Sequence, residues 1–178
     1  MSIIIFDTET TGLLSPSCSE EQPRIIELGA LKIDCNVNVL GTLSQLINPE
    51  TIISKKISKL TGITENCVKD KPTFIEFFPK LKEFFSDVDV MICHNTSFDL
   101  GMLNAELKRN NLTLKTPEII VCTVLEYQHI FGGYVKLKDM YKHFLGFELT
   151  QTHRALDDCI ALFDILKKDK NPYITGAL

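Results

Sequence analysis

Four acidic residues and one histidine offer the clearest chemistry in this sequence. They are spread over most of the chain: Asp7, Glu9, Asp99, His153 and Asp158. Carboxylate oxygens are the ligands that Mg²⁺ and Mn²⁺ prefer. Two such ions about 3.5–4 Å apart stabilise both the attacking and the leaving oxygen in phosphodiester hydrolysis. A histidine that titrates near neutral pH can take a proton from the attacking water. Together the five side chains suit a two-metal hydrolytic site.

Each acid also has a simpler explanation when it is taken alone. Asp7 and Glu9 could be solvated residues where a strand ends. Asp99 and the neighbouring pair Asp157 and Asp158 stand in the first turns of expected helices, where negative charge favours the helix dipole. In α/β proteins, however, functional groups collect where strand ends face helix starts. The joint presence of four carboxylates and an imidazole at such positions favours the metal site.

The apolar run at residues 3–6 is expected to form a central strand that delivers the first two acids. The run is rich in Ile and does not alternate with polar residues, which is typical of a strand covered on both faces. Because side chains alternate along a strand, Asp7 and Glu9 project to the same side. Two like charges 4 Å apart repel by roughly 4 kcal/mol at an effective dielectric constant of about 20. A buried pair therefore calls for a neutralising cation.

The remaining hydrophobic pattern predicts one α/β domain with a mixed sheet. Two β-like runs at 24–34 and 37–48 extend the first strand into an antiparallel meander, and two more strands are expected at 88–93 and 118–122. Helices are expected over 55–62, 64–70, 73–85, 97–110, 124–131, 137–144 and 152–168. Ser97 is the expected N-cap of the helix that carries Asp99. The pattern thus places five strands between flanking helices.

Three short segments resemble the motifs of a known enzyme family. FDTETTG at 6–12, HNTSFD at 94–99 and HRALDD at 153–158 are similar, in this order, to the three motifs of the DEDD-type 3′–5′ exonucleases. The histidine indicates the DEDDh, or DnaQ-like, branch, typified by the proofreading subunit or domain of bacterial DNA polymerase III. LTGIT at 60–64 matches a further segment of that group. The resemblance implies a ribonuclease H-like fold, two divalent metal ions and release of nucleoside 5′-monophosphates from a 3′ end.

The resemblance also implies a role for each motif residue. Asp7, Glu9, Asp99 and Asp158 match the metal ligands, and His153 matches the general base. Helical spacing alone would prefer Asp157, because positions 153 and 158 would point about 140° apart on one helix. The family spacing therefore implies that His153 precedes the last helix. Residues expected to contact substrate are Thr8, Thr10, Leu13, His94, Asn95 and Phe98, although the threonines also suit a strand and the phenylalanine a core.

Composition is compatible with one soluble domain and does not exclude a nucleic-acid partner. The 178 residues are 44% hydrophobic and 24% charged, and we expect a domain over 1–170 followed by a loosely held tail over 171–178. The chain shows neither a membrane-length apolar run nor a signal peptide, so a cytoplasmic location is expected. The six cysteines lack C-x-x-C spacing and are predicted to be reduced, mostly buried thiols. The net charge of −4 becomes zero if the four predicted ligand carboxylates are neutralised.

Three functions are consistent with these features. The first is a metal-dependent 3′–5′ exonuclease that acts on single-stranded or frayed DNA ends in proofreading or repair. The second keeps the chemistry and trims RNA, since the motif residues carry no record of the sugar. The third is a catalytically silent module that binds nucleic acid or a polymerase, although the retention of all five motif residues argues against it. A neutral body predicts weak, distributive binding, so a DNA polymerase or a sliding clamp is the natural partner.

Overall fold

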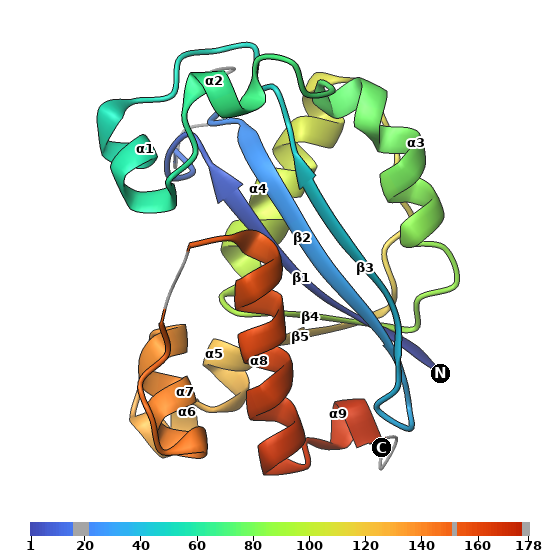
Figure 1. Ribbon diagram of the computed structural model, residues 1–178. Helices are drawn as coiled ribbons and strands as arrows, with labels where there is room; N and C mark the ends of the chain where they lie inside the picture. Colours follow the sequence, from blue (N-terminus) through green and yellow to red (C-terminus); the bar gives the residue numbers. More distant parts are fainter. Residues whose placement is uncertain (16–21, 151–152, 176–178) are drawn as a thin grey trace.

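A mixed β-sheet between two helical layers forms the framework of the computed structural model, which describes residues 1–15, 22–150 and 153–175 (Figure 1). Within these residues the sheet has five strands in the order β3-β2-β1-β4-β5. They are β1 (Ser2–Thr10), β2 (Ile25–Asp34), β3 (Val39–Leu46), β4 (Val90–Cys93) and β5 (Ile119–Cys122). The first three are antiparallel neighbours, whereas β4 and β5 run parallel to β1. The predicted mixed sheet and its antiparallel meander are therefore confirmed.

Strand β1 is covered on both faces, as its unbroken apolar run predicted. Ile3 and Ile5 belong to a core shared with α7 and α8, whereas Ile4 and Phe6 belong to a core shared with α3 and α4. The four side chains are fully buried. These helices are α3 (Phe74–Phe84), α4 (Thr96–Arg109), α7 (Leu137–Leu145) and α8 (Ala155–Asp169). Alternate residues of β1 therefore face different helical layers.

Shorter helices complete the described chain at the ends of the sheet. They are α1 (Lys55–Thr61), α2 (Glu65–Val68), α5 (Thr123–Glu126), α6 (Gln128–Phe131) and α9 (Pro172–Thr175). Figure 1 shows α1 and α7 on either side of the first turn of α8. The single helix expected over 124–131 is divided into α5 and α6 at Tyr127, a buried residue whose hydroxyl donates to Asp169. No helix in the described ranges is long and apolar enough to cross a membrane.

Residues 171–175 pack against the domain, so the loose tail expected from 171 onward is wrong for this part. Ile174 is fully buried in the core beneath α8. The side-chain amide of Asn171 donates to the hydroxyl of Tyr127, and its carbonyl accepts from the backbone and hydroxyl of Thr175. These contacts continue the fold beyond the end of α8. The last part of the predicted tail, 176–178, lies outside the described residues.

The cysteines are less buried than their sequence surroundings indicated. All five in the described part of the chain are free thiols. Only Cys93 and Cys159 are buried, whereas Cys35 and Cys122 are half-buried and Cys67 is exposed. Cys35 follows the last residue of β2 and so escapes the core that its apolar neighbours enter. The expectation of mostly buried thiols is therefore wrong for this set.

Candidate active site

The predicted site residues gather where β1 ends and where α4 and α8 begin. Asp7 and Glu9 continue the alternation of Ile3 and Ile5, so both lie on the face of the sheet that α8 covers. Glu9, His153 and Asp158 offer ligand atoms that all lie within 4.8 Å of one another, and all three side chains are half-buried. Residues 144 positions apart in the chain, Glu9 and His153, are thus neighbours in the fold.

Asp99 approaches β1 from the opposite layer. It lies in the first turn of α4, is only 2% exposed, and accepts two hydrogen bonds from Thr8 on one carboxylate oxygen. The donors are the backbone N–H of Thr8 at 3.0 Å and its hydroxyl at 2.8 Å. Thr8 stands between Asp7 and Glu9, so these bonds fix the Asp99 carboxylate beside both of them. Burial raises the pKa of Asp7, and the nearby negative charge of Asp99 raises that pKa further.

Helix α4 begins at Thr96, one residue earlier than expected, and its N-cap is Asn95 instead of Ser97. Asn95 adopts the left-handed conformation (φ 68°, ψ 58°), which asparagine tolerates better than most residues. The side chain of Ser97 donates to the Asn95 side chain at 3.1 Å. The next residue, Thr96, is buried and donates its hydroxyl to the carbonyl of Val121 on β5. This link joins the start of α4 to the sheet, which positions Asp99.

His153 lies before α8, as the family spacing implied. The helix begins at Ala155, with Arg154 as its N-cap, so the expected start at 152 is wrong. His153 has a left-handed backbone with φ 49°. Asp158, in the first turn of α8, is the acid that groups with His153 and Glu9, whereas Asp157 is exposed. The choice of Asp158 over Asp157 therefore agrees with the geometry, because His153 and Asp158 do not lie in one continuous helix.

A buried ion pair beside the site was missed in the sequence. Glu27 on β2 stands opposite Glu9 in the strand register and is fully buried. Its carboxylate accepts from Nε of Arg154 at 2.9 and 3.0 Å, from Nη2 of the same guanidinium, and from the backbone N–H of Ala155 at 3.1 Å. The available signal was a single acid inside the apolar run of β2, where an unpaired charge would be costly.

Gly29, two residues further along β2, lets the first turn of α8 lie directly on the strand. A Cβ at this position would be 2.3 Å from the carbonyl carbon of Ala155 and 2.3 Å from the nitrogen of Leu156. Side-chain atoms do not approach backbone so closely, so any larger residue would displace the helix start. The glycine therefore sets the spacing between β2 and the residues that follow His153.

The pKa values of the four acids are raised, so each binds its proton more tightly than usual. Burial is the main cause: it raises the pKa of Glu9 to about 8, of Asp99 to about 7 and of Asp158 to about 6. Burial also raises the pKa of Asp7 well above its ordinary value, and the negative charges of Asp99 and Asp158 raise it further. The hydrogen bonds from Thr8 partly oppose the effect on Asp99. Such concentrated negative charge, presented by hard oxygen donors, fits divalent cations held by the four carboxylates.

His94, which is expected to contact substrate, uses both of its ring nitrogens within the protein. Its Nδ1 lies 3.0 Å from the hydroxyl of Thr123 and its Nε2 lies 3.0 Å from the carbonyl of Val135. Burial lowers the pKa of His94, which favours the neutral ring. A neutral ring that donates from Nε2 to the carbonyl and accepts at Nδ1 satisfies both contacts. Both ring nitrogens are therefore used to join β4 to α5 and to the segment before α7.

The two predicted substrate-binding threonines also use their hydroxyls within the protein. Thr8 directs both of its donors to Asp99, and Thr10 donates its hydroxyl to the carbonyl of Gly12 at 2.7 Å. Both side chains are buried, at 5% and 7% exposure. Both hydroxyls therefore hold the site and the turn after β1, and their contact with substrate stays a prediction.

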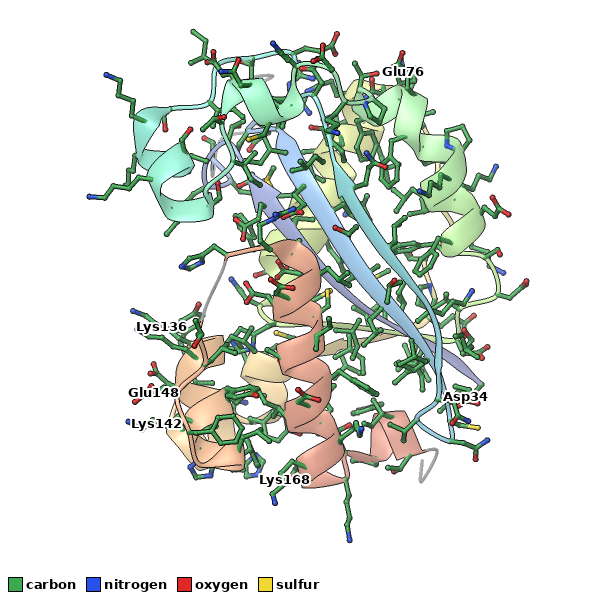
Figure 2. The ribbon with its side chains drawn as sticks, viewed as in Figure 1. Asp34, Glu76, Lys136, Lys142, Glu148 and Lys168 are labelled. Carbon is green, nitrogen blue, oxygen red and sulfur yellow. The ribbon has the colours of Figure 1, made fainter. Side chains whose placement is uncertain are left out.

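Three of the predicted substrate contacts remain accessible around the site. Leu13, just after β1, is 83% exposed. Asn95 and Phe98 at the start of α4 are half-buried, and the phenylalanine packs partly against the core shared by α3 and α4. Lys136, which Figure 2 shows at the start of α7, is the residue after Val135, whose carbonyl lies 3.0 Å from Nε2 of His94. These side chains provide apolar, polar and basic surface at the edges of the site.

Comparisons with known proteins agree with this geometry. The chain matches the exonuclease family RNase_T over residues 4–166. It is 37% identical over 164 residues to a DNA polymerase III of PolC type from Clostridium perfringens (strain 13 / Type A), covering 92% of this chain but 11% of that protein. It is 35% identical over 168 residues to the DNA polymerase III subunit epsilon of Treponema pallidum (strain Nichols), covering 89% of this chain and 73% of the subunit.

A similar fold occurs in the nuclease domain of 3′hExo, described as a DEDDh family member bound to rAMP. The TM-score is 0.73 with 21% sequence identity, and the match covers 96% of this chain and 92% of that domain. The ribonuclease H-like architecture expected from the motifs is thereby confirmed. The chain belongs to the RNase_T exonuclease family, as its resemblance to the DEDDh exonucleases predicted.

Proposed function

We propose that the protein is a 3′–5′ exonuclease that hydrolyses the terminal phosphodiester of single-stranded or frayed DNA and releases nucleoside 5′-monophosphates. The observation that carries the proposal is the grouping of Glu9, His153 and Asp158 beside Asp7, with Asp99 held at the same strand end by Thr8. This is the donor set that a two-metal phosphodiesterase requires. The relatives named as DNA polymerase III proteins support DNA as the substrate.

The proposed chemistry divides the work between cations and protein side chains. Divalent cations held by Asp7, Glu9, Asp99 and Asp158 would neutralise the negative charge that develops on the phosphate and on the leaving 3′ oxygen. His153 would accept a proton from the attacking water. Because His153 precedes α8, its ring is not confined to the helix face that carries Asp157, and it can face Glu9 and Asp158.

Recognition of the strand would rely on surface around the site. Leu13 and Phe98 could stack against terminal bases without reading their sequence, and Asn95 could contact the backbone. The family motif residues bind phosphate and metal, so DNA and RNA would differ through contacts to the 2′ position. Trimming of RNA is therefore the second outcome that the experiment must separate.

Weak binding to DNA would suit a chain that works with a partner. The net charge is −4, because 23 acidic residues outnumber the 19 lysines and arginines that could bind phosphate. The chain spans about a tenth of the PolC-type relatives, which are much longer proteins. We propose that the protein is cytoplasmic and acts with a DNA polymerase or a sliding clamp. The much longer relatives that contain a similar segment are named as DNA polymerases, which supports such a partner.

A digest of end-labelled oligonucleotides tests the proposal. A 5′-labelled single strand should shorten stepwise from its 3′ end in Mg²⁺ or Mn²⁺, and the released product should co-migrate with nucleoside 5′-monophosphate. Excess EDTA or Asp7→Ala should abolish shortening, and undiminished activity in either case would overturn the mechanism. A matched RNA strand in the same tube reports the sugar preference. Tight binding without any product would favour the catalytically silent module.

A further inference from the structure

The ion pair between Glu27 and Arg154 has no direct part in the proposed chemistry, yet it lies beside it. We infer that this pair is a positioning device that holds His153 and Asp158 in their catalytic arrangement. The inference rests on the proposed function, because it assumes that His153 is the general base. Glu27 lies on β2 and Arg154 lies just before α8, and neither is one of the four proposed metal ligands.

The Glu27 carboxylate fixes the chain on the C-terminal side of His153. It binds the side chain of Arg154 through two guanidinium nitrogens and the backbone N–H of Ala155. Arg154 and Ala155 are consecutive, so both the residue after His153 and the first residue of α8 are tied to β2. The carboxylate also satisfies one of the N–H groups that a helix start leaves unpaired. The left-handed backbone of His153 then turns the imidazole toward Glu9.

The same anchor reaches Asp158. The carbonyl of Arg154 accepts the backbone N–H of Asp158 at 3.1 Å, which is the first hydrogen bond of this helix turn. Glu27 also stands directly opposite Glu9 in the β1–β2 register. One buried carboxylate therefore sets the relative position of the strand that carries Glu9 and the segment that carries His153 and Asp158. Gly29 permits the close approach that these contacts need.

The energetic character of the pair favours a positioning role. Glu27 is fully buried, whereas the Arg154 side chain is 44% exposed. An ion pair with a buried carboxylate contributes little net stability, because the cost of removing that charge from water offsets the attraction. A well-packed apolar pair would hold β2 against α8 at least as strongly. The ion pair differs from an apolar pair because three directed hydrogen bonds from Arg154 to Glu27 fix the relative position of the two side chains.

A second buried pair provides a matched control. Glu106 on α4 is 2% exposed, pairs with Arg109 at 2.7 Å and accepts the backbone N–H of Ile25 at 3.1 Å. Like Glu27, it combines a buried carboxylate, an arginine and a backbone donor from another element. It lies two helical turns beyond Asp99 and contacts none of the proposed catalytic residues. Glu106→Gln therefore reproduces the loss of a buried ion pair without disturbing His153.

A double-mutant cycle tests the inference. Glu27→Gln should lower kcat by about 10- to 100-fold with little change in KM, as is typical when a group that orients a catalytic residue is altered. In a His153→Ala background the same change should cause a clearly smaller loss, because the part of its effect that acts through His153 is already gone and only the part that acts through Asp158 remains. Glu106→Gln should leave kcat unchanged. Equal loss from Glu27→Gln with and without His153 would overturn the inference.

A measurement without nucleic acid separates this inference from the proposed function. The ¹H–¹³C spectrum of the four histidine Cε1–Hε1 groups reports the ring environment directly. The His153 signal, identified by its loss in His153→Ala, should shift or broaden in Glu27→Gln, whereas those of His129 and His143 should not. Arg154→Lys, which keeps the charge but loses the planar fork, should produce the same change if Glu27→Gln folds poorly. An unmoved His153 signal in both variants would overturn the inference even if DNA is digested.

Discussion

Thr8 donates both its backbone N–H and its hydroxyl to a single oxygen of Asp99, at 3.0 and 2.8 Å. This relationship joins the strand that carries Asp7 and Glu9 to the helix of the opposite layer. Both bonds go to the same oxygen, so Thr8 does not engage the second Asp99 oxygen, which is available to the proposed cation. The threonine of the first motif is therefore a structural partner of the second-motif aspartate, a role that neither motif reveals separately.

Replacing Thr8 by Val should weaken the site by removing one of these two bonds. The change keeps the shape of the side chain but leaves the buried Asp99 carboxylate short of a donor, which costs about 1–3 kcal/mol of unfolding free energy. We expect a lower kcat and weaker Mn²⁺ binding, measured by digestion and by isothermal titration calorimetry. Thr8→Ser, which retains the hydroxyl, should preserve both. Equal behaviour of the two variants would show that the hydroxyl is dispensable.

Replacing His153 by Ala should lower kcat by about 10²- to 10⁴-fold, the usual contribution of a general base. The side chain is half-buried outside any helix, so the midpoint of urea unfolding should change little. His129→Ala provides the matched control, because His129 is exposed and its Nδ1 lies 2.9 Å from the carbonyl of Glu126, away from the proposed site. Nearly full activity in His153→Ala would remove this residue from the proposed mechanism.

The metal-free protein should lose stability as pH rises from about 4 to 8. Burial and mutual repulsion raise the pKa of Glu9 to about 8, of Asp99 to about 7 and of Asp158 to about 6. In the unfolded chain the same groups titrate near pH 4. An acid whose pKa is raised by folding stabilises the folded state at pH values below its pKa in the unfolded chain. This contribution is lost as the pH rises through its pKa in the folded protein.

Thermal unfolding in EDTA between pH 4.5 and 8, a range set by these pKa values, checks that expectation. Saturating Mn²⁺ at the alkaline end should restore the lost stability, since it binds only the folded site. Asp7→Asn removes one of the interacting charges and should flatten the dependence in EDTA. A melting temperature that neither falls with pH nor responds to Mn²⁺ would contradict the proposed cation site.

Replacing Gly29 by Ala should shift α8 and reduce both stability and activity. The new methyl group would lie 2.3 Å from backbone atoms of Ala155 and Leu156, so the helix start must move. Overpacking of this kind costs about 1–3 kcal/mol. Gly41→Ala on β3 is the matched control, because its methyl would meet only the ring of Phe84 at 3.4 Å. Urea unfolding of the two variants measures the difference, and equal midpoints would argue against the tight contact.

The local pattern of the sequence was sufficient for β1 and for the sheet as a whole. An uninterrupted run of isoleucines can be satisfied only between two apolar layers, and both layers are present around Ile3 to Phe6. The preference for Asp158 over Asp157 came from motif spacing. The physical reason, a helix that begins only at Ala155, became apparent in the structure. The periodicity places that start three residues too early.

Contacts between distant segments could not be read from the sequence. Glu27 stands in an apolar strand, and nothing near it in the chain identifies Arg154 as its partner 127 positions away. His94 was predicted to contact substrate because its motif is catalytic, yet its ring nitrogens bind Thr123 and Val135. In each case the hydrogen-bond partner of the polar side chain lies in a distant segment of the chain. That segment comes close only when the sheet has assembled.

The alternation of β1 has a consequence for when the chain can cut nucleic acid. Its α8-facing residues supply Asp7 and Glu9, while its other face binds Asp99 through Thr8. The complete set of acids thus exists only after both helical layers have docked on one strand. Before both layers dock, Asp99 and Asp158 are not held beside Asp7 and Glu9, so the proposed site is incomplete. Under the proposed mechanism, completion of the fold would therefore confine digestion of nucleic acid to the finished molecule.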